Sequence, residues 1–313
     1  MTNEVLTESK LAATAEATNT ATSPEGSRKL RGVYDGDGFH WVGDGFYVTQ
    51  VLPGQANLQR EADPFLLMDY HAPREYAPTD TPRGVGPHPH RGFETVTLAF
   101  EGSVAHHDST GSGGVINAGD AQWMTAAGGI LHKEYHEEHW ARRGGRFHMM
   151  QLWVNLPSAN KMDTPGYQTL TADQMGKVEL AGGGNVKLYA GELDGTRGPA
   201  STFTPIELWD VELTAGETTS LVVPEGHTTM VFVLDGDVAT EGGSVGFQQL
   251  GMFEREGGNV TLTAGGGGAR LILLGGEPIG EDVIFYGPFA MNTEEQIVEA
   301  IEDFNSGKFG HLV

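Results

Sequence analysis

The chain has 313 residues, which at about 100 to 200 residues per domain is enough for two domains with sizeable cores. Its 42 acidic and 19 basic residues give a formal net charge of -23, which disfavours direct binding to nucleic acid or to anionic membranes. The chain has no cysteine, so disulfides, thiolate ligands and a cysteine nucleophile are excluded, and any metal must bind to His and carboxylate side chains.

Residues 1–27 are rich in Thr, Ala, Ser and Asn and contain few large apolar side chains, so we expect a disordered tail. This segment lacks the basic start and apolar centre that are typical of a signal peptide. No apolar run approaches the roughly 20 residues that a membrane-spanning helix needs. We therefore expect a cytoplasmic protein without a membrane span.

From Val33 onward, short runs rich in Val, Phe, Tyr and Leu alternate with glycine turns, a pattern that indicates β-strands. The runs cover residues 46–52, 94–100, 121–126, 149–156, 185–191, 206–213, 228–238, 259–264 and 269–276. Many short strands at close spacing predict an all-β sandwich or barrel.

Two similar halves are indicated by a weak internal repeat. GVGPHPHRGFETVTLAFEGSV in the first half and VPEGHTTMVFVLDGDV in the second each combine a turn, a histidine, a β run and an acidic turn. The stretch LPSANKMDTPGYQTL between the halves is typical of a connector. We expect an N-terminal domain over residues 28–160 and a C-terminal domain over residues 161–313.

A helix is predicted near the C-terminus. Asn292 or Thr293 is its candidate N-cap, and Gly307 follows its expected end. The residues expected on its apolar stripe are Ile297, Val298, Ile301 and Phe304.

Two histidine-containing pairs have the spacing of metal ligands on strands. Successive strand residues face opposite sides of a sheet, so His88 and His90 share one face. His132 and Glu134 share a face in the same way if their segment is extended. Three imidazoles and one carboxylate would suit a divalent transition metal such as Fe, Mn, Co, Ni, Cu or Zn.

A resemblance to the pirin family of the cupin superfamily runs from about Arg31 to Gly310. It is carried by HPHRGFETVTLAFEGSVAHHDSTGSGGVINAGDAQWMTAAGGILHKE and by YGPFAMNTEEQIVEAIEDFNSGKFG. The resemblance implies two tandem cupin (jelly-roll) β-barrels, the first with one metal, usually iron, and the second without. The sequence departs from the family at Ala127, where glycine is frequent, so we expect one altered turn.

The family's ligand pattern maps onto His88, His90, His132 and Glu134. The general cupin motif offers Glu94 as a competing carboxylate, because it has the same strand parity as the first histidine pair. The resemblance favours Glu134 as the ligand and leaves Glu94 as a partner that orients a ligand imidazole. A bulge at Gly92 would break that parity.

The resemblance implies a quercetin 2,3-dioxygenase that cleaves a flavonol ring with dioxygen at Fe(II). Glu134 would be the base that takes the proton of the flavonol 3-hydroxyl, with Glu94 as the alternative base. A rival hypothesis is a non-enzymatic, redox-sensing protein that binds a transcription factor or a metabolic enzyme. A third is a metal-dependent reaction on another small molecule, since a fold does not fix chemistry.

The other histidines are predicted to be peripheral. His106 and His107 precede a Ser-, Thr- and Gly-rich turn, so a loop position is expected. His136 and His139 have acidic neighbours and are expected to be solvated, with raised pKa values. In the second half only His227 occupies the matching turn, so no second metal site is expected.

Overall fold

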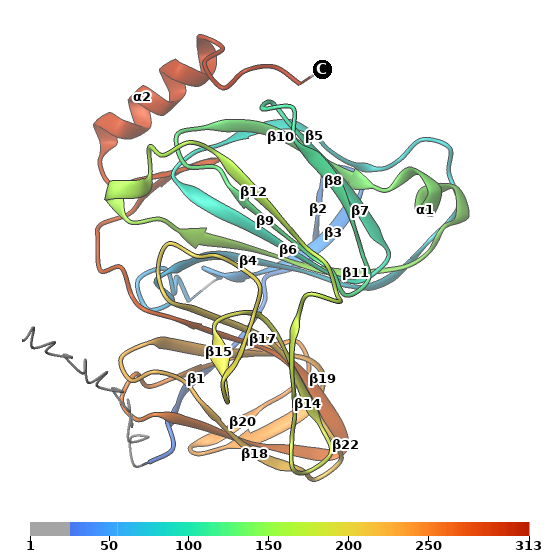
Figure 1. The fold of residues 1–313 in the computed structure, drawn as a ribbon, viewed down its shortest axis with the longest axis vertical. Coiled ribbons are helices and arrows are strands. Elements are labelled where there is room, and N and C mark those ends of the chain that lie inside the picture. The colour runs from blue at the N-terminus through green and yellow to red at the C-terminus, as the bar shows by residue number, and fades with distance from the viewer. Residues whose placement is uncertain (1–25, 55, 313) are drawn as a thin grey trace, which may run out of the picture.

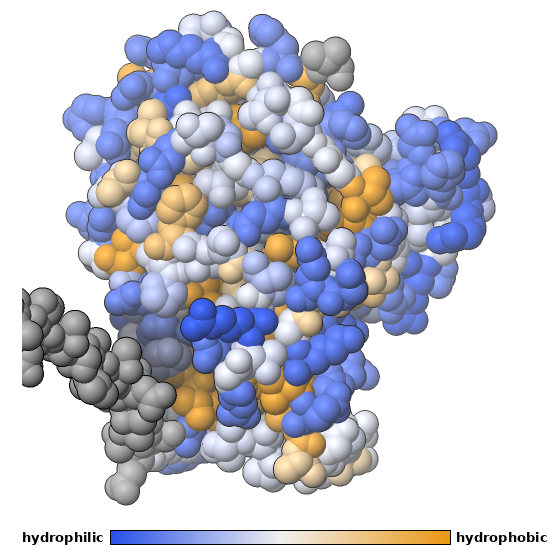
Figure 2. Space-filling model, in the orientation of Figure 1, coloured by the Kyte–Doolittle hydropathy of each residue, from blue (hydrophilic) through white to orange (hydrophobic). Residues whose placement is uncertain are grey.

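The computed structural model describes residues 26–54 and 56–312, and strands dominate this part of the chain. The strands form two β-barrels that lie one above the other in Figure 1. The tail predicted for residues 1–27 lies outside the described residues except for its last two. On the face drawn in Figure 2, hydrophobic residues are scattered among hydrophilic ones. No helix within the described ranges is long and apolar enough to cross a membrane.

The first barrel consists of a seven-stranded and a four-stranded sheet. The seven-stranded sheet has the order β12 (Gly166–Leu170), β9 (Ala121–Thr125), β6 (Phe93–Glu101), β11 (Gly145–Asn155), β4 (Phe65–Tyr76), β3 (Phe46–Leu52) and β2 (His40–Val42). The four-stranded sheet has the order β5 (Gly84–His90), β10 (Ile130–His136), β7 (Ser103–Asp108) and β8 (Gly113–Asn117).

The second barrel is built from one nine-stranded sheet. Its main path is β1 (Leu30–Asp35), β21 (Gln249–Phe253), β19 (Thr228–Thr240), β22 (Asn259–Gly276), β17 (Ile206–Leu213), β14 (Asn185–Ala190) and β13 (Gly176–Glu179). Two further strands pair with β22 and β19, respectively: β18 (Thr218–Val222) and β20 (Gly243–Val245). The runs predicted at residues 259–264 and 269–276 are joined in the single strand β22.

The remaining elements are short. They are the hairpins β15 (Glu192–Leu193) with β16 (Thr196–Arg197) and β23 (Ile284–Tyr286) with β24 (Phe289–Met291), the helices α1 (Glu138–Arg143) and α2 (Glu294–Asn305), and a 3-10 turn at Ser158–Asn160. Two barrels with a short C-terminal helix were predicted, and this arrangement is confirmed.

The largest hydrophobic cluster lies between the two barrels, because it combines one face of the seven-stranded sheet with one face of the nine-stranded sheet. Val96 and Leu98 of β6 meet residues such as Phe232 of β19 in this cluster. Since strand residues alternate between faces, the other face of β6 points into the first barrel. This distinction between the two faces decides the position of every site residue on β6.

Three segments contact a different barrel from the one expected from their position in the sequence. Strand β1 precedes the first barrel in sequence but pairs with β21 of the second barrel. Strand β12 pairs with β9 of the first barrel, although it follows residue 160. Helix α2 comes last in the chain and lies over the first barrel (Figure 1). Sheet membership therefore does not follow the division expected at residue 160.

Helix α2 begins as predicted, with Thr293 as N-cap in a capping box with Gln296. The predicted apolar stripe is wrong in part, because Val298 is 54% and Phe304 38% exposed. The buried positions are Ile297, Ala300 and Asp303. Asp303 lies on the buried face of the helix, where its carboxylate forms an ion pair with Arg91 of the first barrel.

Candidate metal centre

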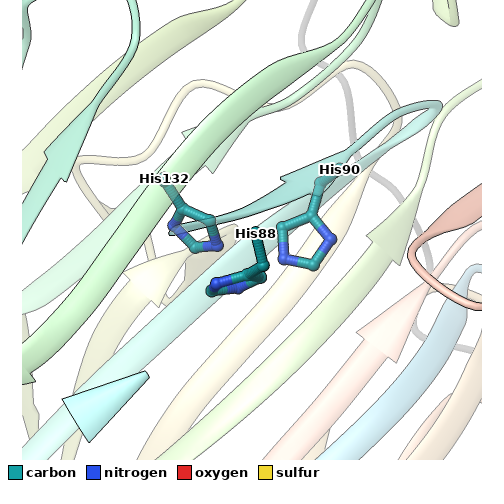
Figure 3. Close-up of side chains that lie close together, drawn as sticks. All are labelled: His88, His90 and His132. Carbon is teal, nitrogen blue, oxygen red and sulfur yellow. The ribbon is translucent and has the colours of Figure 1, made fainter. Parts of the chain in front are cut away.

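Three histidines converge because β5 and β10 are antiparallel neighbours in the four-stranded sheet. In their register His132 lies opposite His88, and Ile130 lies opposite His90. One nitrogen of each of His88, His90 and His132 lies within 4.8 Å of the others. Figure 3 shows the three rings grouped around one space. The structure thus brings together the two histidine segments that the sequence placed about 40 residues apart.

The ring nitrogens of this cluster are free to bind an ion. His88 Nδ1 lies 2.8 Å from the carbonyl oxygen of Gly86, which leaves its Nε2 as a lone-pair donor. His90 Nδ1 and His132 Nε2 are buried and have no hydrogen-bond partner. Buried nitrogens without partners are costly unless something binds them. These residues therefore fit a divalent transition metal.

Electrostatics keeps the imidazoles in the form that binds metals. Burial, followed by the neighbouring imidazoles, lowers the pKa of His90 and His132 well below the ordinary histidine value. Both side chains are therefore neutral at physiological pH, which is the state a ligand imidazole requires.

Glu134 lies beside His132 rather than among all three imidazoles. Its carboxylate belongs to a second group of close donor atoms, with His106 and His132. Oε1 accepts a hydrogen bond of 3.2 Å from the Thr97 hydroxyl, and Oε2 accepts one of 2.9 Å from the Gln151 amide. Sequence reasoning did not identify Thr97 or Gln151, since only the pairing of β6 with β11 places them together.

Glu94 lies on the opposite face of β6 from Thr97. Val96 and Leu98, which share its face, pack into the cluster between the barrels. Its carboxylate accepts a 2.7 Å hydrogen bond from Thr125 and belongs to neither group of close metal-binding atoms. The sequence predicted that Glu94 would share a strand face with His88 and His90. Gly92 interrupts this alternation, because it has φ +90° and separates β5 from β6.

Aromatic side chains form one wall of the site. The rings of Phe93 and Trp153 stack with centroids 4.3 Å apart, and both lie about the same distance from the His90 ring, at 5.1 and 5.2 Å. Phe93 is fully buried, whereas Trp153 and His88 are partly exposed. Phe285, from the C-terminal segment, packs against the same cluster. Trp153 and His88 thus both reach the solvent.

Two predictions about other histidines are wrong. His106 and His107 both lie in strand β7 rather than in a loop, and His106 is fully buried. His136 is also buried and packs among Phe46, Tyr76 and Trp140. Burial lowers the pKa of His136 to about 4, in contrast to the raised value expected from its acidic neighbours. The strand alternation in VAHHDS was the signal that could have identified His106.

In the second barrel His227 Nδ1 lies 2.8 Å from a carboxylate oxygen of Glu207. Both groups of close donor atoms found among the described residues belong to the first barrel.

Comparison with known proteins decides the family. The family model described as Pirin matches residues 45–154, and the one described as Pirin C-terminal cupin domain matches residues 208–310. A Pseudomonas aeruginosa protein whose name provisionally assigns it as a quercetin 2,3-dioxygenase is 46% identical over 283 residues, which cover 90% of this chain and 98% of that protein. The chain belongs to the pirin family.

Other pirin relatives agree over most of the chain. A pirin-like protein of Caulobacter vibrioides is 40% identical over 85% of this chain and 94% of its own length. The crystal structure of a quercetin 2,3-dioxygenase from Acinetobacter baumannii has a TM-score of 0.88 and 44% identity, covering 92% of this chain and 100% of that chain. The predicted tandem cupin architecture is thereby confirmed.

Proposed function

We propose that this pirin is a metal-dependent quercetin 2,3-dioxygenase with one mononuclear site in the first barrel. The observation that carries the proposal is the group of three imidazoles that each have a nitrogen within 4.8 Å of the others, with His90 Nδ1 and His132 Nε2 buried and without a hydrogen-bond partner. The provisional assignment of the Pseudomonas aeruginosa protein and the name of the Acinetobacter baumannii structure support the substrate class.

His88, His90 and His132 would hold the metal, with Glu134 next to His132 as the fourth ligand or as the base. Iron(II) is the metal that the family resemblance favours, and the donor set also suits Mn, Co, Ni, Cu or Zn. The bound metal would supply the redox chemistry between dioxygen and the flavonol.

The chain's own residues would bind and orient the flavonol. Trp153 offers a partly exposed aromatic surface beside His90, against which a flat polyphenol can stack. The Glu134 carboxylate is held in place by Thr97 and Gln151 and can take the proton of the flavonol 3-hydroxyl. Glu94 is separated from this space by the sheet, so Glu134 is the preferred base.

Oxygen uptake and carbon monoxide release from quercetin test this function. Apo-protein is loaded with Fe(II), Co(II) or Ni(II), and each form is assayed with its metal content measured on the same sample. We expect quercetin-dependent oxygen uptake in proportion to bound metal and its loss in His132→Ala.

His139→Ala is the matched control, because His139 is an exposed histidine on α1. It should keep both the metal content and the turnover of the parent protein. Turnover without metal, or none in any metal-loaded form, would contradict the proposed function.

A further inference from the structure

A second histidine, His106, contacts the proposed ligand His132. The Nδ1 atoms of His106 and His132 are 3.3 Å apart, and both rings are fully buried. The antiparallel register of β7 and β10 fixes this contact, since it places His106 opposite Glu134 and Asp108 opposite His132.

We propose that His106 is a positioning residue that accepts a hydrogen bond from His132 Nδ1–H and so directs His132 Nε2 toward His88 and His90. The inference rests on the proposed metal site and goes beyond it by assigning a role to a histidine that is not among the expected ligands.

The hydrogen-bond chemistry of two imidazoles supports this direction. A neutral imidazole carries one proton, so one of two facing nitrogens must donate and the other must accept. If His132 Nδ1 donates, its Nε2 has a free lone pair, in agreement with the absence of a hydrogen-bond partner there. If His106 donated instead, His132 Nε2 would carry the proton and could not bind a metal.

The same assignment explains the surroundings of His106. With Nδ1 as acceptor, its Nε2 carries the proton; this nitrogen makes no hydrogen bond, and Asp108 Oδ2 lies 3.8 Å from it, within ion-pair distance. Asp108 is itself held in place, since its Oδ1 accepts hydrogen bonds from the backbone N–H groups of Thr110 and Ser112 at 2.8 and 3.1 Å. A fixed carboxylate thus favours the tautomer of His106 that can accept from His132.

Packing prevents the His106 ring from turning away. Its ring stacks on Tyr167 of β12 with centroids 5.0 Å apart and planes 18° apart. Tyr167 is supplied by a strand that pairs with the opposite sheet of the same barrel. The His106 ring is therefore held in one plane, with Nδ1 facing His132 and Nε2 facing the Asp108 carboxylate.

An alternative role for His106 is that of a ligand, because His106, His132 and Glu134 also have donor atoms within 4.8 Å of one another. In that arrangement His106 would bind the ion itself, together with His132 and Glu134. The experiment below separates the two roles.

The test compares His106→Asn with His106→Gln by Co(II) titration of apo-protein, followed by visible absorption. The amide oxygen of Asn can occupy the position of Nδ1 and still accept, whereas Gln places its amide near the position of Nε2. We expect Gln to weaken Co(II) binding by about 10-fold or more and Asn to stay within about threefold of the parent protein, with an unchanged spectrum.

His107→Gln is the matched control, since His107 is the adjacent histidine, is exposed, and lies against Tyr135 on the other side of the sheet. Its Co(II) affinity should equal that of the parent protein. Thermal unfolding of each apo-variant shows whether the fold is kept.

Parent-like affinity in His106→Gln would overturn the positioning role. A loss in His106→Asn equal to that in Gln, or a changed spectrum in Asn, would identify His106 as a ligand and would also overturn it. If the Gln variant does not fold, Asp108→Asn takes its place, with an expected loss of about threefold or more and parent-like affinity as the contradicting result. Failure of the parent protein itself to bind Co(II) would instead contradict the proposed metal site.

Discussion

The guanidinium of Arg91 and the carboxylate of Asp303 form a buried ion pair, with Nη2 and Oδ2 2.8 Å apart, although 212 residues separate them in the sequence. Arg91 directly follows the candidate ligand His90, and Asp303 belongs to helix α2. The Arg91 side chain also donates to the carbonyl of Gly128 and lies over the ring of Phe309. The ion pair therefore links helix α2 to the end of strand β5, which carries His88 and His90.

Asp303→Ala should lower the free energy of unfolding by about 3–5 kcal/mol, because it leaves the Arg91 charge buried without its partner. Urea unfolding at pH 7 measures the change. Glu302→Ala is the control, since Glu302 is the exposed neighbour on the same helix and should change little. Equal losses in the two variants would contradict a role for the ion pair.

The same pair predicts a dependence on acid. Hydrogen bonds from Lys308 and then Arg91 lower the pKa of Asp303 below its ordinary value of 3.8. A carboxyl group with a lowered folded-state pKa stabilises the fold above its unfolded pKa and loses this contribution as the pH falls through the folded pKa. The stability difference between the parent protein and Asp303→Asn should therefore shrink below about pH 4 and stay constant between pH 5 and 8.

Glu94→Gln should stabilise the protein at alkaline pH. Burial raises the pKa of Glu94 to about 7 from 4.5, so keeping this side chain ionised in the fold costs free energy. The free energy of unfolding therefore falls as the pH rises from about 4.5 to 7, by on the order of 2–3 kcal/mol. Gln keeps the acceptor for Thr125 and removes the titration, so its unfolding free energy should exceed that of the parent protein at pH 8.

The same variant tests the position of Glu94 relative to the metal. Because its carboxylate lies on the face between the barrels, Glu94→Gln should keep the parent Co(II) affinity and oxygen uptake within about a factor of three. A hundredfold loss of turnover in this variant would restore Glu94 as a candidate base.

The sequence predicted those parts of the site that depend on local alternation. His88 with His90, and His132 with Glu134, each share a strand face as expected from their spacing. The same reasoning was wrong for Glu94, because Gly92 takes a positive φ and separates β5 from β6. Alternation is therefore informative within a strand and loses its meaning at a glycine that breaks it.

Contacts between distant segments could not be predicted in this way. The pairing of β1 with β21 and the position of α2 depend on which surfaces of two similar barrels are left uncovered, and local patterns do not encode this. His106 was missed for a related reason, since its role depends on the register between β7 and β10. The turn residues after Asp108 drew the prediction toward a loop, although the strand continues to Asp108.

The Ala127 turn is a point where backbone strain can be measured. Ala127 has φ 38°, a conformation that costs an alanine about 1–2 kcal/mol, and its carbonyl accepts from Gly92 N–H at 2.8 Å. Loss of the buried methyl group costs about 0.8 kcal/mol, so Ala127→Gly should match or exceed the parent stability. Ala126→Gly, at the adjacent buried alanine without a positive φ, should lose about 1–2 kcal/mol. Equal losses would contradict strain at Ala127.

Glu134→Gln separates proton transfer from metal binding. The carboxylate accepts from Thr97 and Gln151, so both donors hold it in place beside His132. An amide has no basic oxygen, and we expect quercetin-dependent oxygen uptake to fall by about 10²–10⁴-fold. Three imidazoles remain, so Co(II) affinity should fall by no more than about 10-fold.

Glu138→Gln is the control for this variant, because Glu138 is an exposed carboxylate on α1 that pairs with Arg142. It should keep both affinity and turnover. Parent-like turnover in Glu134→Gln would exclude Glu134 as the base. If Co(II) affinity and turnover fell together by more than about 100-fold, the main role of Glu134 would be that of a fourth ligand. The ratio of the two losses therefore decides between the two positions that the geometry allows this carboxylate: beside the imidazoles as a base, or among them as a ligand.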